Sequence, residues 1–70
     1  MTTPIIGNFQ WMKSLNRSLV LNTIRSEGPI SRADIAKKTA LAPPTVTNIV
    51  NELLEERFIV ESEVGLSSGG

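Results

Sequence analysis

The chain has 70 residues with no cysteine, no histidine and no tyrosine, and its seven basic and seven acidic residues give a formal net charge of zero. A domain this small has a marginal hydrophobic core, and without cysteine it cannot be stapled by disulfides. The missing residue types remove most nucleophile and general-base arrangements, so the composition argues against an enzyme. Nothing in the sequence predicts a membrane span, a signal peptide, a metal site or a cofactor in this segment, and we expect a cytoplasmic protein.

Charge is unevenly distributed along the chain. Residues 1–50 carry six basic and two acidic side chains, a net charge of +4, whereas residues 51–70 carry one basic and five acidic side chains, a net charge of −4. Such an asymmetry can orient a protein on a polyanion, although an ordinary solvated surface explains it equally well.

The first helical pattern follows a short segment without any period. Residues 1–12, interrupted by Pro4 and Gly7, are predicted to form an N-terminal arm. From about residue 11 to residue 26, apolar side chains recur at three- and four-residue steps and predict a helix. These side chains are Leu15, Leu19, Val20, Leu21 and Ile24. The Gly-Pro step at 28–29 ends this helix, and Ile30 is predicted to be a buried point or a short strand.

A second, short helix is predicted between Ser31 and Thr39. The hydroxyl of Ser31 can accept a hydrogen bond from a free N–H group of the first turn. Residues 40–42 then form a turn. The side chains expected to face inward are Ala33, Ile35 and Ala36, and those expected to face water are Arg32, Lys37 and Lys38.

A third, longer helix is predicted over residues 43–56. Pro43 and Pro44 suit its first turn, where a missing N–H group has no partner to lose. Its apolar residues form a complete amphipathic stripe, made of Val46, Ile49, Val50, Leu53 and Leu54. Residues 58–60 predict a short strand that could extend to residue 64, and residues 65–70 are predicted to be a glycine-rich wing tip, cut before the returning strand.

This order of elements predicts a three-helix winged helix-turn-helix, mainly α with a small β wing, over residues 13–64. In that motif the second helix of the pair lies in the major groove of DNA, and its first residues meet base edges. The candidate base contacts are Pro44, Thr45, Thr47, Asn48 and Asn51. None is acidic, although the helix dipole favours acids at such a position, and asparagine can pair bidentately with adenine. An ordinary polar face is the alternative interpretation.

Contacts to the DNA backbone have candidates on all three helices. They are Arg17, Ser31 and Arg32, and phosphate contacts there would fix the position of the domain. An ordinary solvated surface explains Arg17 and Arg32 about equally well. The N–H groups of Thr45 and Val46 are predicted to be free and able to donate to a phosphate.

Four segments resemble the N-terminal winged-helix domain of ROK-family transcriptional repressors, bacterial sugar-responsive regulators of the xylose-repressor type. They are residues 16–25, 28–36, 45–53 and 67–70, and the likeness covers residues 13–70. Its most specific parts are the Ser-Arg-Ala at 31–33 and the wing residues Ser67, Ser68, Gly69 and Gly70. The resemblance implies a homodimer on double-stranded DNA and a sugar effector bound by a separate C-terminal domain.

Three positions depart from the family pattern. Ala40 and Ala42 stand where such domains commonly have a glycine and a capping serine, and Arg57 stands where a glycine often ends the recognition helix. A turn at Arg57 that needs a positive φ would be strained.

The sequence therefore predicts a sequence-specific DNA-binding domain of a repressor. The first alternative is a winged helix used for protein contact, which the zero net charge and the apolar residues Ile5, Ile6, Phe9 and Trp11 would suit. The second is a fragment of a sugar kinase, which is disfavoured because no phosphate loop or sugar site is recognisable.

Overall fold

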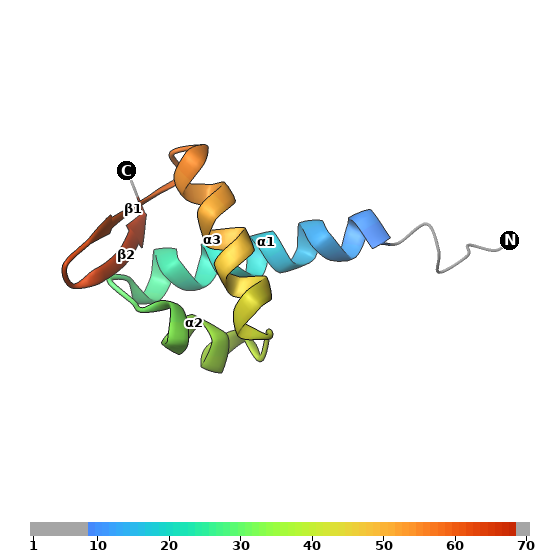
Figure 1. Cartoon of the computed structure of the whole chain (residues 1–70), viewed down its shortest axis with the longest axis horizontal. Helices are drawn as coiled ribbons and strands as arrows, with labels where there is room; N and C mark the ends of the chain where they lie inside the picture. The colour runs from blue at the N-terminus through green and yellow to red at the C-terminus, as the bar shows by residue number, and fades with distance from the viewer. Residues whose placement is uncertain (1–8, 69–70) are drawn as a thin grey trace, which may run out of the picture.

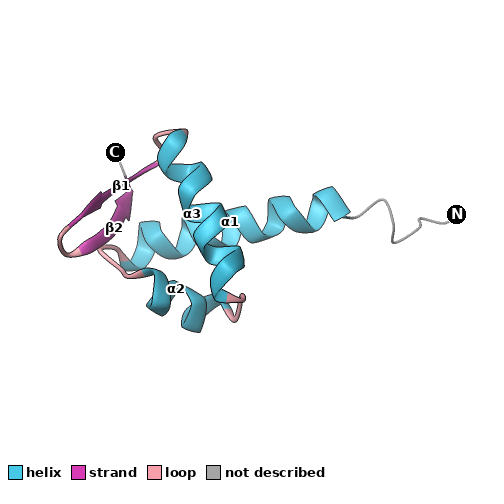
Figure 2. Ribbon diagram, viewed as in Figure 1, coloured by secondary structure: helices cyan, strands magenta, loops and turns pink. Residues whose placement is uncertain are grey.

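The computed structural model describes residues 9–68, which form three helices followed by a two-stranded hairpin (Figure 1). The elements in chain order are α1 (Phe9–Glu27), α2 (Arg32–Thr39), α3 (Pro43–Glu55), β1 (Ile59–Ser62) and β2 (Gly65–Ser68). In Figure 2 the hairpin lies at one end of the helical body, and the N-terminal half of α1 projects at the other. The predicted fold class, mainly α with a small β wing, is confirmed.

Helix α1 is longer than predicted, because it begins at Phe9. Residues 9–12 are thus helical and the predicted end of the arm was wrong, while residues 1–8 lie outside the described part of the chain. The apolar residues that set its period divide into two groups. Val20 and Ile24 are buried and Leu21 is half-buried against the core, whereas Leu15 and Leu19 are 48% and 43% exposed. One strip of α1 therefore faces the other helices, and its outer face keeps large apolar side chains.

Helix α2 is defined by its two ends. Ser31 is extended, and its Oγ accepts a hydrogen bond from the Asp34 N–H at 3.1 Å, as predicted for a capping serine. At the other end Ala40 adopts a left-handed conformation, with φ 62°. Ile35 is buried, but Ala33 is exposed, so the predicted inward orientation of Ala33 was wrong. Ala33 stands two positions before the buried Ile35, so the two side chains lie about 200° apart around the helix axis.

Helix α3 supplies the centre of the hydrophobic core. Four of its five stripe residues are buried and Leu54 is half-buried; the buried four are Val46, Ile49, Val50 and Leu53. They pack with buried residues from the rest of the fold, namely Val20, Ile24, Ile30, Ile35, Ile59 and Leu66. Burying each such side chain stabilises the fold by roughly 1.5–3 kcal/mol, so this stripe determines which side of α3 stays outside.

The wing is a complete hairpin. β1 and β2 pair antiparallel with Ser62 opposite Gly65, and residues 63–64 form the turn. The predicted wing tip, cut before the returning strand, was therefore wrong: residues 65–68 are the returning strand. Gly69 and Gly70 lie outside the described residues.

Two residues explain why this glycine- and serine-rich segment forms a strand. Gly65 has φ 136°, which a side chain rarely allows, and a Cβ there would lie 2.8 Å from the backbone nitrogen of Ile30. Leu66 is buried and exchanges two backbone hydrogen bonds with Ile30, at 3.0 and 2.8 Å. The predicted burial of Ile30 is confirmed, and it is this bridge that ties the wing to the helices.

Candidate DNA interface

The side of α3 opposite its buried stripe is exposed and free of acidic residues through its first half. Pro44, Thr47, Asn48 and Asn51 are exposed, and Thr45 is half-buried at the side facing α1. No acidic residue occurs in the first turn of the helix, and the first one along α3 is Glu52. The five predicted base contacts therefore share the outward half of α3, and all but Pro44 have a hydroxyl or amide group available for hydrogen bonds to base edges.

The N-terminus of α3 is a weaker anion site than predicted. Ala42 occupies the N-cap position and makes no side-chain capping bond, and prolines fill the next two positions. The N–H of Val46 donates to the Ala42 carbonyl at 3.0 Å, so the prediction that it is free was wrong. Because proline has no N–H group, Thr45 alone among residues 43–46 remains as a backbone donor for a phosphate.

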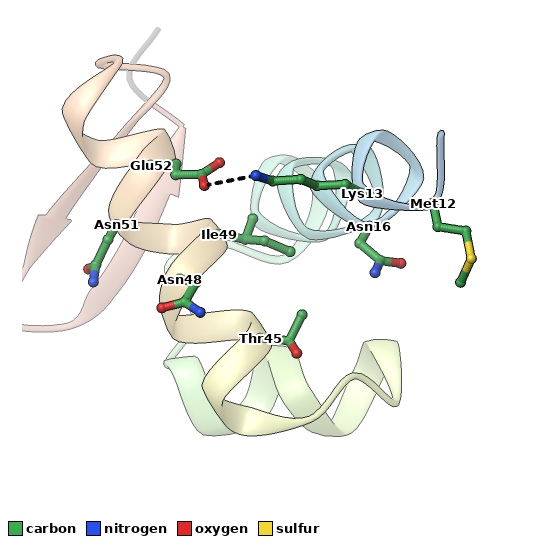
Figure 3. A pocket seen from close by; sticks show the side chains of 8 residues that line it. All are labelled: Met12, Lys13, Asn16, Thr45, Asn48, Ile49, Asn51 and Glu52. Atoms are coloured by element: carbon green, nitrogen blue, oxygen red, sulfur yellow. Dashed lines mark ion pairs between the residues drawn. The ribbon is translucent and has the colours of Figure 1, made fainter. Parts of the chain in front are cut away.

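A groove of about 600 Å³ separates the first half of α3 from α1 (Figure 3). Its lining residues are Met12, Lys13, Asn16, Thr45, Asn48, Ile49, Asn51 and Glu52. Two polar side chains of α1, Lys13 and Asn16, thus stand across from Asn48. Neither was among the DNA contacts predicted from the sequence. Lys13 precedes Arg17 by four residues, a spacing that places both on one side of a helix and could have marked this strip.

A second groove, of about 520 Å³, borders α3 on its other side, against α2. Thr47 lines it from α3, and Arg32 and Lys37 line it from α2. The predicted base-contact face is therefore flanked by cationic side chains from two different helices. Lys37, which the sequence analysis assigned to the solvated side of α2, is one of them.

The second half of α3 is fastened to α1 by Arg17. Its Nη1 donates to Glu52 Oε1 at 2.8 Å, and its Nη2 donates to Glu56 Oε1 at 2.8 Å. Lys13 Nζ lies 3.7 Å from the second oxygen of Glu52. The hydrogen bond from Arg17 holds the pKa of Glu56 below its usual value, and the bonds to Glu56 and then to Glu52 raise the pKa of Arg17. Arg17, predicted to contact DNA phosphates, is placed between two helices.

The other two predicted backbone contacts are also engaged within the domain. Ser31 is the capping residue of α2, and Arg32 Nη1 donates to Glu61 Oε2 in β1 at 2.5 Å. The Arg32 hydrogen bond holds the pKa of Glu61 below its usual value. In the wing, Ser67 is half-buried and Ser68 is exposed. The structure thus places Ser31 and Arg32 beside the wing, away from the groove that contains Asn48.

Folding brings the basic and acidic halves of the sequence together. Three acidic residues of the second half, Glu52, Glu56 and Glu61, pair with basic residues of the first half. Within residues 9–68, the cations that make no ion pair are Arg25, Lys37 and Arg57. The +4 and −4 of the linear sequence therefore do not become two separate surfaces of opposite charge.

The same described residues hold no group of three or more metal-ligating acidic side chains. None of their helices combines the length and the apolar character that crossing a bilayer requires.

Comparison with known proteins agrees with this geometry. Residues 14–60 match a family model described as winged helix-turn-helix DNA-binding, which spans more than half of the chain. The N-acetylglucosamine repressor of Escherichia coli O157:H7 is 43% identical over 65 residues, and the xylose repressors of Caldicellulosiruptor bescii and Bacillus subtilis are 42% and 38% identical over the same length. These alignments cover 93% of this chain but 16–17% of each relative, so the chain spans a small part of their length.

A solved structure shows the same likeness in three dimensions. The crystal structure of a ROK family transcriptional regulator, a homologue of the Escherichia coli Mlc protein, matches with a TM-score of 0.79 and 33% sequence identity. The match covers 83% of this chain and 17% of that one. The resemblance to ROK-family repressors that the sequence indicated is confirmed. The chain belongs to the winged helix-turn-helix DNA-binding family, in the form found in ROK-family regulators.

Proposed function

We propose that this domain reads a specific sequence of double-stranded DNA by placing the first half of α3 in the major groove. The base contacts would be Pro44, Thr45, Thr47, Asn48 and Asn51. The observation that carries this proposal is the acid-free outer face of α3, exposed between two grooves that hold cationic side chains. The family match favours DNA over a purely protein-binding winged helix.

Asn48 occupies the centre of this reading face. It is exposed, it lines the α1–α3 groove, and it lies one helical turn after Pro44 and nearly one turn before Asn51. Its amide can donate to and accept from the major-groove edge of adenine in a bidentate pair, which discriminates by roughly 1–3 kcal/mol against another base. Thr45 and Thr47 lie on either side of it, toward α1 and α2 respectively.

The DNA backbone would pass over the flanking grooves. Lys37 beside Thr47 and Asn16 beside Thr45 would contact phosphates on the two sides of the major groove, and Lys13 would join them after leaving Glu52, whose Oε2 lies 3.7 Å from its Nζ. Arg17, Ser31 and Arg32 were predicted for this role, but each already holds a partner in the free domain. Arg17 and Arg32 would have to exchange a carboxylate for a phosphate. The wing residues Ser67, Ser68, Gly69 and Gly70 would lie along the adjacent groove.

The relatives suggest how such a domain is used. They are named as a xylose repressor or an N-acetylglucosamine repressor, and they extend far beyond the part that this chain matches. We propose that this domain serves a cytoplasmic, sugar-responsive repressor that binds a palindromic operator as a homodimer, with the effector sugar bound elsewhere in the full-length protein.

The test is fluorescence anisotropy on the 70-residue chain with two duplexes, one selected from a random library by the wild-type domain and one of scrambled sequence, at two salt concentrations. Binding should weaken as salt rises, because phosphate contacts release counterions. Asn48→Ala should lower affinity for the selected duplex by about tenfold or more while hardly changing affinity for the scrambled one. Asn22→Ala, at an exposed site on α1, is the matched control. An Asn48→Ala variant that keeps the full preference would refute the proposed reading face.

A further inference from the structure

Arg32, at the start of α2, lies between two hollows of the surface. It lines the α2–α3 groove together with Thr47, one of the proposed base contacts. It also lines a smaller hollow, of about 240 Å³, between the start of α2 and the wing, where Glu61 and Glu63 lie. The long side chain of Arg32 has many rotamers, so its guanidinium can serve either the proposed DNA interface or the wing.

In the free domain the wing holds this guanidinium. Arg32 Nη1 donates to Glu61 Oε2 at 2.5 Å, and Arg32 Nη2 lies 3.5 Å from Glu61 Oε1. Both terminal nitrogens of Arg32 thus face the two oxygens of one carboxylate. A guanidinium binds a carboxylate in the same forked geometry that it uses for a phosphate. Glu61 therefore occupies the groups with which Arg32 would bind the DNA backbone.

We propose that Glu61 is an internal competitor for the DNA phosphate that Arg32 would otherwise bind, and that it lowers the affinity of the domain for DNA of any sequence. This inference rests on the proposed docking of α3 in the major groove. A DNA strand that passes over the α2–α3 groove leaves Arg32 two alternatives. If Arg32 stays with Glu61, a phosphate contact is missing. If it turns to the phosphate, an ion pair is broken and an unpaired carboxylate is left near the DNA, so both alternatives weaken binding.

The wing does not depend on this ion pair for its place in the fold. Leu66 exchanges two backbone hydrogen bonds with Ile30, and both Leu66 and Ile59 are buried in the core. The side chains of Arg32 and Glu61 are 35% and 46% exposed, and ion pairs at such sites contribute little to stability. Removing the charge of Glu61 should therefore free Arg32 while the wing keeps its fold.

The test compares two substitutions that each remove one negative charge from the wing of the 70-residue chain. Glu61→Gln frees Arg32, whereas Glu63→Gln, the matched control, removes an exposed acid that makes no ion pair within residues 9–68. Fluorescence anisotropy at one salt concentration measures binding to the selected and to the scrambled duplex. Glu61→Gln should raise affinity at least about threefold, and Glu63→Gln less than about twofold. The gain should be the same for both duplexes, because phosphate contacts carry no sequence information.

Arg32→Gln shows whether the gain passes through Arg32. In the Arg32→Gln background, Glu61→Gln and Glu63→Gln should have equal effects, because no guanidinium remains to be freed. Circular dichroism shows whether each variant keeps the fold of the wild type. Equal gains for Glu61→Gln and Glu63→Gln in the wild-type background, or a loss of affinity in Glu61→Gln, would overturn the proposal. A gain in Glu61→Gln that persists undiminished beside Arg32→Gln would overturn it too.

Failure of this inference differs from failure of the proposed reading face. Asn48→Ala should change the ratio of the affinities for the selected and the scrambled duplex, whereas Glu61→Gln should leave that ratio unchanged. A chain that binds neither duplex at low salt would refute the docking on DNA, and the role of Glu61 with it. A chain that binds DNA but responds equally to Glu61→Gln and Glu63→Gln would refute the role of Glu61 alone.

Discussion

The first half of α3 and its second half differ in what surrounds them. Residues 43–51 have no side-chain cap and no ion pair, and their outer side chains are exposed amides and hydroxyls. From Glu52 onward the helix carries carboxylates, and Arg17 and Lys13 of α1 hold Glu52 while Arg17 also holds Glu56. The buried stripe runs through both halves, so the core does not distinguish them.

This difference shows how a nearly neutral domain can still face a polyanion. The acids of α3 are confined to the half that would tilt away from DNA, and cations from α1 compensate two of them. The half that would enter the groove is left without charge, so its selectivity would come from hydrogen bonds while attraction would come from the flanking grooves. In the proposed docking, Arg17 would serve DNA binding by fixing α3 and masking carboxylates, in place of a phosphate contact.

The largest expected effect comes from placing an acid in the first half. Asn51→Asp should lower DNA affinity at least about tenfold at low salt, because a carboxylate would face the phosphates and the major-groove acceptors. Anisotropy with the selected duplex measures it. Asn22→Asp makes the same change in net charge at an exposed site on α1, and should cost much less affinity. Similar losses for the two variants would mean that overall charge matters and that the proposed face of α3 has no special place in binding.

The features that could be predicted from the sequence depend on residues that lie close together within one element. The α3 stripe and the Ser31 cap depend on residues within a turn or two, and both were predicted correctly. The wing was not, because residues 65–68 look like a flexible tip until Leu66 pairs with Ile30 across the fold. The role of Arg17 depends on acids that lie 35 and 39 positions further along the chain, and no local pattern shows them.

The departures at Ala42 and Arg57 allow the two ends of α3 to be compared by stability. Arg57 has φ 66°, as the family pattern suggested, and a non-glycine residue there costs about 1–2 kcal/mol. Arg57→Gly should therefore raise the free energy of unfolding by about 1 kcal/mol, and Ala42→Ser should add a similar amount by supplying the missing cap. Urea denaturation measures both.

Two control variants separate these causes. Arg57→Ala keeps the strain but removes the charge, so its free energy of unfolding should rise little. Ala33→Ser lies inside α2, so its free energy of unfolding should fall slightly. A gain in Arg57→Ala equal to that in Arg57→Gly would assign the effect to charge.

The smallest expected effect comes from breaking the ion pairs that join Arg17 of α1 to Glu52 and Glu56. Arg17→Leu should slightly lower stability at neutral pH, since its partners are solvent-exposed and such pairs contribute little. The hydrogen bond from Arg17 lowers the pKa of Glu56 below the ordinary value of 4.5, so the folded chain keeps Glu56 ionised at a pH where the unfolded chain protonates it. The stabilisation of the folded state by the Arg17–Glu56 pair is therefore present above about pH 4.5 and is lost as the pH falls through the lowered pKa of Glu56. Urea midpoints measured as the pH falls through this range should converge for wild type and Arg17→Leu. Glu56→Gln should remove the same pH-dependent loss of stability, leaving the loss due to Glu61 and Arg32.

The salt dependence of DNA binding separates the two roles considered for Arg17. If Arg17 contacts a phosphate, Arg17→Leu should reduce by about 1 the slope of the logarithm of affinity against the logarithm of salt concentration. If Arg17 only holds α3, that slope should be unchanged.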